Sequence, residues 1–274
     1  MTILDQIVAR KFREVEERKF LYPVSSLEKS SIFKKKPESL KKGLIREGSL
    51  GIIGEFKRKS PSRGSINENA NAVEVCLEYI EAGCSAVSVL TDREFFGGSS
   101  GDLTVVRTQV DSPVLRKDFI VDEYQIIEAR SIGADAILLI AELHPAEKME
   151  RLFRFAQSLE IEVIVEIHDK KNIDRIPYDT EIIGINSRDL NSFRVNPDHL
   201  PRIIRFLPGK VLKVAESGIK SVNDYMSLKN AGFNAFLIGE YFMSSANPGG
   251  TCKSFIEAIK QYPLDPYSKN QHIK

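Results

Sequence analysis

Charged side chains that could do acid–base chemistry follow the first apolar run of the chain. The stretch GIIGEFKRKSPS, from Gly51 to Ser62, carries Glu55 and Lys57 at alternate positions. Because side chains along a strand alternate between two faces, Glu55 and Lys57 would share one face and Phe56 would take the other. Burying a carboxylate and an ammonium at the end of an apolar strand is costly. The pair therefore indicates either a functional site or a salt-bridged strand end.

Polar residues also end later apolar runs. They are Lys117 after the third run, Glu166 within the fifth, Asn186 and Arg188 after the sixth, Glu216 and Ser217 after the seventh, and Gly239 after the eighth. Any one of them is weak evidence, because every strand must end in polar residues somewhere. Lysines, carboxylates, an amide and an arginine that meet at one place would instead form an acid–base site.

The elements that must position these residues alternate between short β-branched runs and helical segments. We expect strands near Leu50 to Phe56, Ala86 to Leu90, Pro113 to Arg116, Ala136 to Ile140, Glu162 to Ile167, Ile182 to Ile185, Val211 to Ala215 and Ala235 to Ile238. We expect helices over Ala72 to Ala82, Glu123 to Ile132, Ala146 to Leu159, Asp198 to Phe206, Val222 to Ala231 and Ser254 to Tyr262.

This order of elements predicts an α/β fold, a (β/α)8 TIM barrel, whose usual size is about 250 residues. The alternative is an open doubly wound sheet, but GEFKRKSPS after the first strand lacks the GxGxxG pattern of a nucleotide-binding loop. In a parallel barrel all strands end on the same rim, so the polar residues would converge there. Gly218 and Gly239 would let backbone N–H groups approach a phosphate, and Arg188 could add a charge-assisted contact.

The first 47 residues differ from the rest. Ile3, Leu4, Ile7, Val8 and Phe12 recur at helical spacing and predict an amphipathic helix that lies on an apolar surface. A basic segment with five lysines between residues 34 and 42 is either a solvated linker or a source of positive field for an anionic substrate. We therefore divide the chain into a helical extension (1–47), a barrel (48–262) and a polar tail (263–274).

Composition narrows the partners. Among 274 residues, 39 Lys and Arg balance 38 Asp and Glu, so the net charge of +1 offers no field for nucleic acid. The longest apolar run, Ala136 to Ala141, is too short to cross a bilayer, and the N-terminus lacks a signal-peptide core, so we expect a cytoplasmic protein. The three cysteines and four histidines show no metal-ligand spacing, so we expect idle thiols and no metal, and we assign no histidine to chemistry.

Seven motifs, in order, carry a resemblance to a known family. They are GEFKRKSPS, VLTDREFFGGS, VLRKDFIVDEYQI, GADAILLI, GINSRDL, VAESGI and AFLIGEYFM, between about Gly51 and Met243. In sequence and spacing they resemble indole-3-glycerol-phosphate synthase of tryptophan biosynthesis. The resemblance implies a decarboxylating ring closure and dehydration of 1-(2-carboxyphenylamino)-1-deoxyribulose 5-phosphate, without a cofactor. It also implies that the N-terminal extension lies over the barrel mouth.

The resemblance further assigns roles to individual residues. Lys117 matches the general acid for the ketone oxygen, and neighbouring Lys57 would lower its pKa or pair with the substrate carboxylate. Glu166 matches the second acid–base group, and Glu55 would orient Lys117 or hold its charge. The remaining assignments are sugar contacts by Asn186, Glu216 and Ser217, a wall for the anthranilate ring by Phe96, Phe119 and Leu138, and phosphate contacts by Ser60, Arg188, Gly218 and Gly239.

One departure and two alternatives accompany this assignment. Glu240 follows Gly239 beside the expected phosphate, and we expect its side chain to point outward, where it would not repel the ligand. A phosphoribosylanthranilate isomerase would share the phosphate glycines, but its chemistry usually needs a Cys and Asp pair. A non-catalytic phosphosugar-binding barrel would have no need of Lys57, Lys117 and Glu166 together. The expected partner is a small phosphosugar, with the chain a monomer or weak homo-oligomer.

Overall fold

The apolar runs form a closed parallel barrel in the computed structural model, which describes residues 2–189 and 194–262. The expected tail, 263–274, lies outside the described residues. The barrel strands are β1 (Ile52–Phe56), β4 (Ala86–Leu90), β5 (Val114–Lys117), β6 (Ala136–Ile140), β7 (Glu162–Ile167), β8 (Ile182–Asn186), β9 (Leu212–Glu216) and β10 (Ala235–Ile238). Strand β1 pairs with both β4 and β10, which closes the ring and confirms the (β/α)8 barrel over the open sheet.

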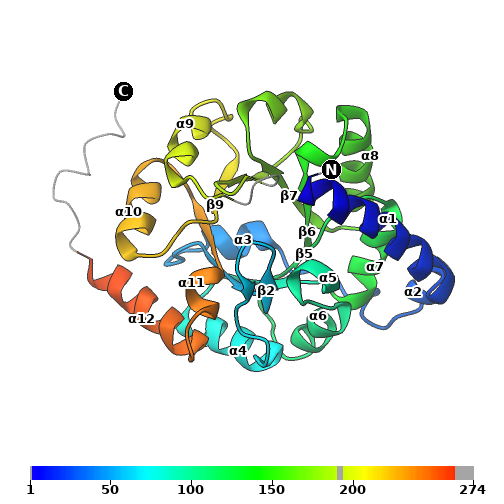
Figure 1. Cartoon of the computed structure of the whole chain (residues 1–274), viewed down its shortest axis with the longest axis horizontal. Coiled ribbons are helices and arrows are strands. Elements are labelled where there is room, and N and C mark those ends of the chain that lie inside the picture. Colours follow the sequence, from blue (N-terminus) through cyan, green and yellow to red (C-terminus); the bar gives the residue numbers. More distant parts are fainter. Residues whose placement is uncertain (1, 190–193, 263–274) are drawn as a thin grey trace.

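Helices surround the strands as an outer ring (Figure 1). The longer ones are α4 (Ala72–Ala82), α6 (Ser100–Arg107), α7 (Glu123–Ile132), α8 (Ala146–Ser158), α10 (Val222–Asn230) and α12 (Pro248–Gln261). Short elements fill other connections: the hairpin β2 (Lys59–Ser60) with β3 (Gly64–Ser65), helices α5 (Arg93–Phe96), α9 (Leu200–Ile204) and α11 (Glu240–Met243), and 3-10 turns η1 (Ala141–Leu143), η2 (Lys170–Arg175) and η3 (Pro197–His199).

Helix α6 was not expected, and α12 begins earlier than expected. Helix α6 begins where Ser99 accepts a hydrogen bond from the backbone N–H of Asp102, a short polar start that the apolar periodicity does not reveal. Helix α12 begins at Pro248, not at Ser254, because the side chain of Asn247 accepts from the backbone N–H of Gly250 and Pro248 has the φ that a first helical turn needs.

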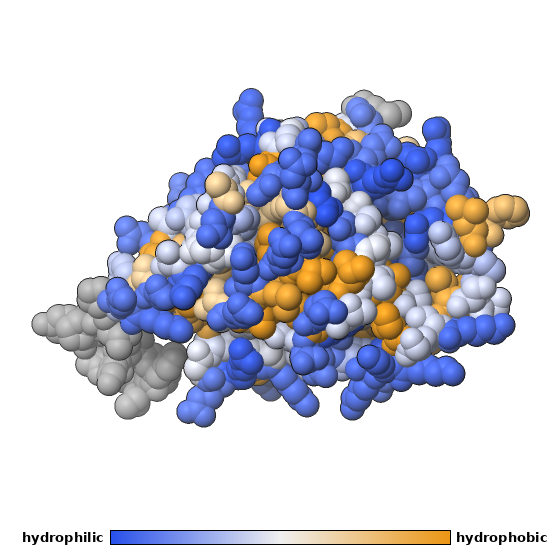
Figure 2. Space-filling view, turned by 90° about the horizontal axis from the view of Figure 1, so that it is seen from below, coloured by the Kyte–Doolittle hydropathy of each residue, from blue (hydrophilic) through white to orange (hydrophobic). Residues whose placement is uncertain are grey.

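Hydrophilic side chains cover most of the face shown in Figure 2, with a band of hydrophobic residues between them. No helix within the described parts of the chain is long and apolar enough to cross a membrane. Cys76, Cys84 and Cys252 are all buried, as expected for idle thiols, and burial raises the pKa of the Cys76 thiol to about 12.

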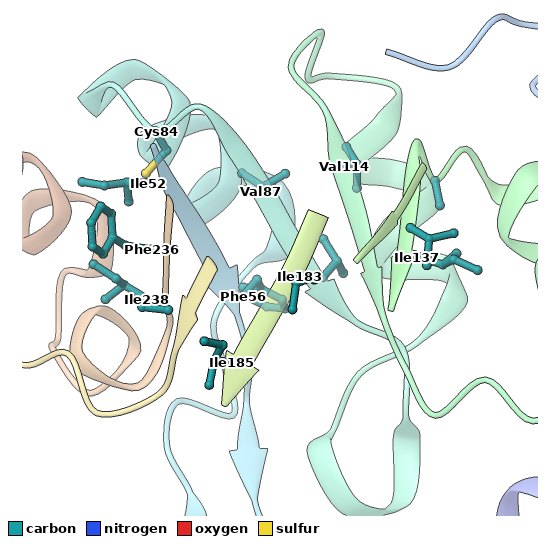
Figure 3. Packing of buried hydrophobic residues seen from close by; sticks show 14 of the residues in the cluster. Ile52, Phe56, Cys84, Val87, Val114, Ile137, Ile183, Ile185, Phe236 and Ile238 are labelled. Atoms are coloured by element: carbon teal, nitrogen blue, oxygen red, sulfur yellow. The ribbon is translucent and has the colours of Figure 1, made fainter. Parts of the chain in front are cut away.

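The period of two along each strand sorts its side chains into two apolar layers. One layer faces the helices and includes Ile52, Phe56, Val87, Ile183 and Phe236, which project from the strands in Figure 3. The other fills the barrel interior and includes Ile53, Leu115, Ile164, Val214 and Leu237. Residues two positions further along the interior face are Glu55, Lys117, Glu166 and Glu216. The strand pattern therefore aims these charges into the barrel mouth.

The N-terminal extension covers both ends of the barrel. Helix α1 (Ile3–Leu21) lies at the carboxyl ends of the strands, where Arg10 pairs with Glu94 and Lys11 with Asp92. A short helix α2 (Val24–Leu27) then leads to α3 (Leu40–Ile45), seen at the centre of the ring in Figure 1. Helix α3 inserts Leu40 and Leu44 into the interior cluster at the opposite end, so the basic segment before it lies away from the mouth.

Helix α1 is amphipathic as predicted, but its buried face differs from the predicted one. Ile7, Lys11 and Val15 are buried, whereas Phe12 is 46% exposed. The Lys11 ammonium, only 1% exposed, lies 3.0 Å from Asp92, 2.9 Å from Asp118 and 2.9 Å from Glu14. The hydropathy pattern gave no sign that this lysine is buried, because it cannot show that buried carboxylates at two strand ends pair with the ammonium group.

We predict that Lys11→Met destabilises the fold by about 3–5 kcal/mol, because it leaves Asp92 and Asp118 buried without their shared cation. Chemical denaturation followed by circular dichroism measures this free energy of unfolding. Lys19→Met, which removes a half-exposed pair with Asp122, is the control and should cost less than about 1 kcal/mol. Equal effects of the two substitutions would contradict the structural role of the Lys11 ion cluster.

Candidate active site

The strand ends open into a cavity of about 790 Å³ at the mouth of the barrel. All but one of the residues proposed from the sequence line it: Glu55, Lys57, Phe96, Lys117, Phe119, Leu138, Glu166, Asn186, Arg188, Glu216, Ser217, Gly218 and Gly239. The exception is Ser60, whose buried hydroxyl lies 3.3 Å from that of Ser62, and it is Ser62 that lines the cavity. The expected convergence of distant strand ends is therefore observed.

Lys117 lies at the centre of this cluster. Its Nζ donates to Glu166 Oε2 at 2.8 Å and to Glu216 Oε2 at 2.7 Å. The three residues come from β5, β7 and β9, and the side chains of both glutamates are 1% exposed. One ammonium thus holds two buried carboxyl groups from strands far apart in the sequence.

The electrostatic environment shifts the pKa values of the two glutamates in opposite directions. Burial alone would raise the pKa of Glu166, but the adjacent Lys117 and His168 lower it to about 2. Burial raises the pKa of Glu216 well above its usual range, and the ionised Glu166 raises it further. The environment therefore favours the ionised form of Glu166 and the protonated form of Glu216. Such a division supplies both a base and an acid in one site.

The pKa of Lys117 is raised, which contradicts our expectation that Lys57 would lower it. Burial would lower this pKa, but the carboxyl groups of Glu166, Glu216 and Glu55 raise it by more. Lys57 instead donates to Glu55 Oε1 at 2.7 Å, so its charge is compensated locally. Lys57 and Lys117 therefore form two separate ion pairs, and the partner of Glu55, which the sequence left open, is Lys57.

Two glycines make room for the buried carboxylates. A Cβ at Gly184 would lie 2.1 Å from Glu216 Oε1, and a Cβ at Gly239 would lie 2.5 Å from Glu55 Oε1. Both separations are far shorter than van der Waals contact. Gly239, expected from the sequence to contact a phosphate, thus has a steric role in placing Glu55.

An apolar wall faces the charged cluster. Phe96 and Phe119 stack at a tilt with ring centroids 5.9 Å apart, and Leu138 belongs to the same interior cluster. Ile3 and Leu4 of α1 pack against this cluster, so the N-terminal helix helps to close the apolar side of the mouth. A flat hydrophobic group could lie between this wall and Lys117.

The opposite side of the cavity is cationic and contains residues that sequence reasoning missed. Arg63 donates to Glu240 Oε1 at 3.0 Å, and Arg188 donates to Glu240 Oε2 at 2.8 Å and to Ser62 Oγ at 2.8 Å. The prediction that Glu240 points outward is therefore wrong. It faces the cavity because two arginines from separate loops compensate its charge and, with Lys57, lower its pKa despite partial burial. The sequence of the turn after β1 gave no indication that Ser62 and Arg63 line the cavity.

Backbone strain accompanies the turn after β9. Ser217 has a φ of 66°, a left-handed conformation that is unusual for a residue other than glycine, and Gly218 follows with a φ of 82°. The Ser187 hydroxyl donates to the Ser217 carbonyl at 3.0 Å and holds this turn in place.

Within the described ranges, no three His, Cys, Asp or Glu side chains are grouped so that they could hold a metal ion.

The closed parallel barrel and the acid–base cluster at its mouth define the class of this protein, a (β/α)8-barrel enzyme. The model of the family described as Indole-3-glycerol phosphate synthase matches residues 4–255. The chain therefore belongs to the indole-3-glycerol phosphate synthase family, and it is a carboxy-lyase.

Similar proteins agree with this assignment. An indole-3-glycerol phosphate synthase from Bacteroides thetaiotaomicron is 42% identical over 258 residues, covering 94% of this chain and 99% of that protein. One from Campylobacter fetus is 40% identical over 242 residues, covering 88% and 94%. Among solved structures, thiamine phosphate pyrophosphorylase from Pyrococcus furiosus has a TM-score of 0.57 over 77% of this chain and 96% of that one. At 13% identity this last likeness concerns the fold alone.

We predict that Gly184→Ala lowers kcat for indole-3-glycerol phosphate formation by about 100-fold, because the new methyl group displaces the Glu216 carboxyl group from Lys117. Steady-state kinetics measures the effect, and a thermal melt verifies folding. Gly209→Ala is the matched control, since nothing lies within 4 Å of its added Cβ. Unchanged turnover in a folded Gly184→Ala protein would show that the position of Glu216 does not matter.

Proposed function

We propose that this enzyme converts 1-(2-carboxyphenylamino)-1-deoxyribulose 5-phosphate into indole-3-glycerol phosphate, carbon dioxide and water, as a step of tryptophan biosynthesis. The observation that supports this most directly is the Lys117 ammonium between Glu166 and Glu216, with an apolar wall on one side and an arginine pair on the other. The substrate has a matching distribution of groups: an aromatic ring, a ketone at the reacting centre and a phosphate at the far end.

Ring closure forms a bond between the carboxyl-bearing ring carbon and the ketone carbon, and the ketone oxygen gains a proton. Lys117 is the proton donor. Its raised pKa keeps it charged at neutral pH, and a developing alkoxide is basic enough to take a proton from it. Lys57 pairs with the substrate carboxylate until that group departs as carbon dioxide and the ring regains its aromaticity.

Dehydration completes the reaction. The new hydroxyl group leaves as water with a second proton, and the carbon next to the nitrogen loses a proton as the indole double bond forms. Glu166, held ionised, takes that proton. The substrate receives two protons in these steps and loses one, so the overall reaction takes up one proton. This uptake matches the loss of a negatively charged carboxylate as neutral carbon dioxide.

The remaining cavity residues bind and orient the substrate. Asn186, Glu216 and Ser217 contact the sugar hydroxyls, and Phe96, Phe119 and Leu138 pack on the anthranilate ring. Arg188, with Gly218 and Gly239, binds the phosphate, and we add Arg63 and Ser62 to this set because they line the same part of the cavity. The buried Ser60 hydroxyl contacts the Ser62 hydroxyl on the side away from the cavity and helps to orient it.

The isomerase alternative lacks its acid–base pair. Cys76, Cys84 and Cys252 are buried and none of them lines the cavity. A binding module would not require a buried ammonium between two carboxyl groups, an arrangement that costs desolvation energy and is typical of catalytic sites.

We predict that Lys117→Met lowers kcat by about 10²- to 10⁴-fold while substrate still binds, because the general acid is removed and the apolar and phosphate contacts remain. Indole fluorescence on mixing with substrate measures turnover, and the chain has no Trp to obscure it. Lys213→Met, at the other end of β9, is the control and should retain activity. A fully active Lys117→Met protein, or a wild-type protein without turnover, would contradict the proposed function.

We predict that Glu240→Gln strengthens binding of inorganic phosphate by about two- to fivefold, because the carboxylate that competes for Arg63 and Arg188 is removed. Competitive inhibition of turnover by phosphate measures the affinity. Glu94→Gln breaks an arginine pair outside the cavity and should leave phosphate binding unchanged. Weaker phosphate binding by Glu240→Gln would show that Glu240 assists the anion site.

A further inference from the structure

A histidine that the proposed mechanism does not use lies directly behind Glu166. The side chain of His168 is 10% exposed and does not line the cavity. Its Nε2 lies 3.5 Å from Glu166 Oε1, and its Nδ1 lies 3.1 Å from Glu142 Oε2. Lys117 binds the other oxygen of the same glutamate. Glu166 therefore has a lysine on one oxygen and an imidazole near the other.

Glu142 is held firmly enough to fix this imidazole. Its Oε1 accepts from the backbone N–H of His168 at 2.8 Å and from the Asn172 side chain. Arg175 donates to the carbonyls of Ala141 at 3.0 Å and His144 at 3.3 Å, which fixes the 3-10 turn η1 that carries Glu142. The second oxygen, Oε2, has no hydrogen bond of its own and faces the imidazole.

The charged groups around the imidazole come from three elements. Glu142 faces it from η1, Glu166 from β7 and Lys117 from β5, while His199 contacts only the backbone carbonyl of His168. Burial would lower the pKa of His168, but the two carboxylates outweigh burial and Lys117 and raise it above the ordinary value. His168 therefore holds a proton more tightly than an unperturbed imidazole does.

A second buried histidine provides an internal comparison. His144 contacts the carbonyl of Ile120 and has no carboxylate partner, so burial lowers its pKa to about 4. His144 is a neutral packing residue. Two histidines buried near the same end of the barrel thus have pKa values shifted in opposite directions, and His168 is the one that lies between carboxylates.

We propose that the Glu142–His168 pair is a positioning unit that keeps Glu166 ionised and in place when Lys117 has given its proton to the substrate. This inference rests on the proposed roles of Lys117 and Glu166. Once Lys117 is neutral, Glu166 loses the cation on Oε2, and its affinity for a proton rises. The imidazolium near Oε1 is the remaining cation, so Glu166 stays available as the base for dehydration.

The first test observes the pair directly and needs no turnover. Long-range ¹H–¹⁵N NMR titration resolves the imidazoles of the four histidines, and His168→Gln identifies the signal of His168. We expect His168 to titrate above about 6.5 in the wild-type protein and at lower pH in Glu142→Gln. A wild-type His168 that titrates below about 6.5, or one that Glu142→Gln does not move, would overturn the proposal.

The second test uses the pH dependence of kcat. In His168→Gln, Glu166 loses a neighbouring cation and its pKa rises, so the limb where activity falls with decreasing pH should move to higher pH. We expect kcat to fall about tenfold on the acidic side of the profile, with a smaller loss at pH 8 and KM changed less than twofold, because Glu166 binds a proton more readily once Lys117 is neutral. In Glu142→Gln, His168 loses its proton earlier, so the alkaline fall in activity should begin at lower pH.

The control is His199→Gln, which disturbs the contact to the backbone carbonyl of His168 but leaves the His168 imidazole in place. This variant should keep the wild-type pH profile. A uniform loss of kcat with an unshifted profile in both His168→Gln and Glu142→Gln would assign the pair a packing role and overturn the proposal. A wild-type protein without turnover would instead contradict the proposed function, and the NMR titration would still decide the charge of His168.

Discussion

The structure depends on the compensation of buried charge at the ends of parallel strands. Lys117 holds Glu166 and Glu216 at 2.8 and 2.7 Å, and removing Lys117 would leave both carboxyl groups buried without their shared cation. This contact is possible because the barrel register brings the ends of β5, β7 and β9 to one rim, and because Gly184 leaves space for Glu216. The Glu142–His168 pair adds a further cation behind Glu166.

The same constraint operates on the other face of β5 and connects the N-terminal helix to the site. Lys117 points into the mouth, whereas its neighbour Arg116 points to the other face and pairs with Glu128. Asp118, which follows the strand at the edge of the cavity, pairs with both Arg116 and Lys11. Burial would raise the pKa of Asp118, but Lys11 and Arg116 hold it well below its usual range. The end of β5 is thus fixed by ion pairs on both faces, and docking of α1 contributes to the position of Lys117, the proposed general acid.

The sequence predicted the barrel, its strands, the shared face of Glu55 and Lys57, and the convergence of Lys117 and Glu166 at one rim, because strand periodicity and parallel topology constrain them strongly. It could not predict which charges pair. Partner choice depends on distances between loops, so Lys57 was wrongly expected to act on Lys117 and Glu240 was wrongly placed outside. The hydropathy pattern likewise put Phe12 on the buried face of α1 and gave no sign that Lys11 is buried. Hydropathy along one helix cannot show that other segments bring carboxylates to that helix.

Internal ion pairs also explain how the cavity can hold several cations before any anion enters. Lys57 lies against Glu55, and Arg63 and Arg188 lie against Glu240, so each cation is oriented and neutralised. In the proposed reaction, the substrate carboxylate and phosphate would replace these carboxylates as partners and meet donors that need little reorganisation. Lys117 differs from the other cations because its partners are buried deeper, at 1% exposure, where a substrate anion cannot replace them. It therefore keeps its proton until a basic oxygen forms beside it, which is the property that a general acid requires.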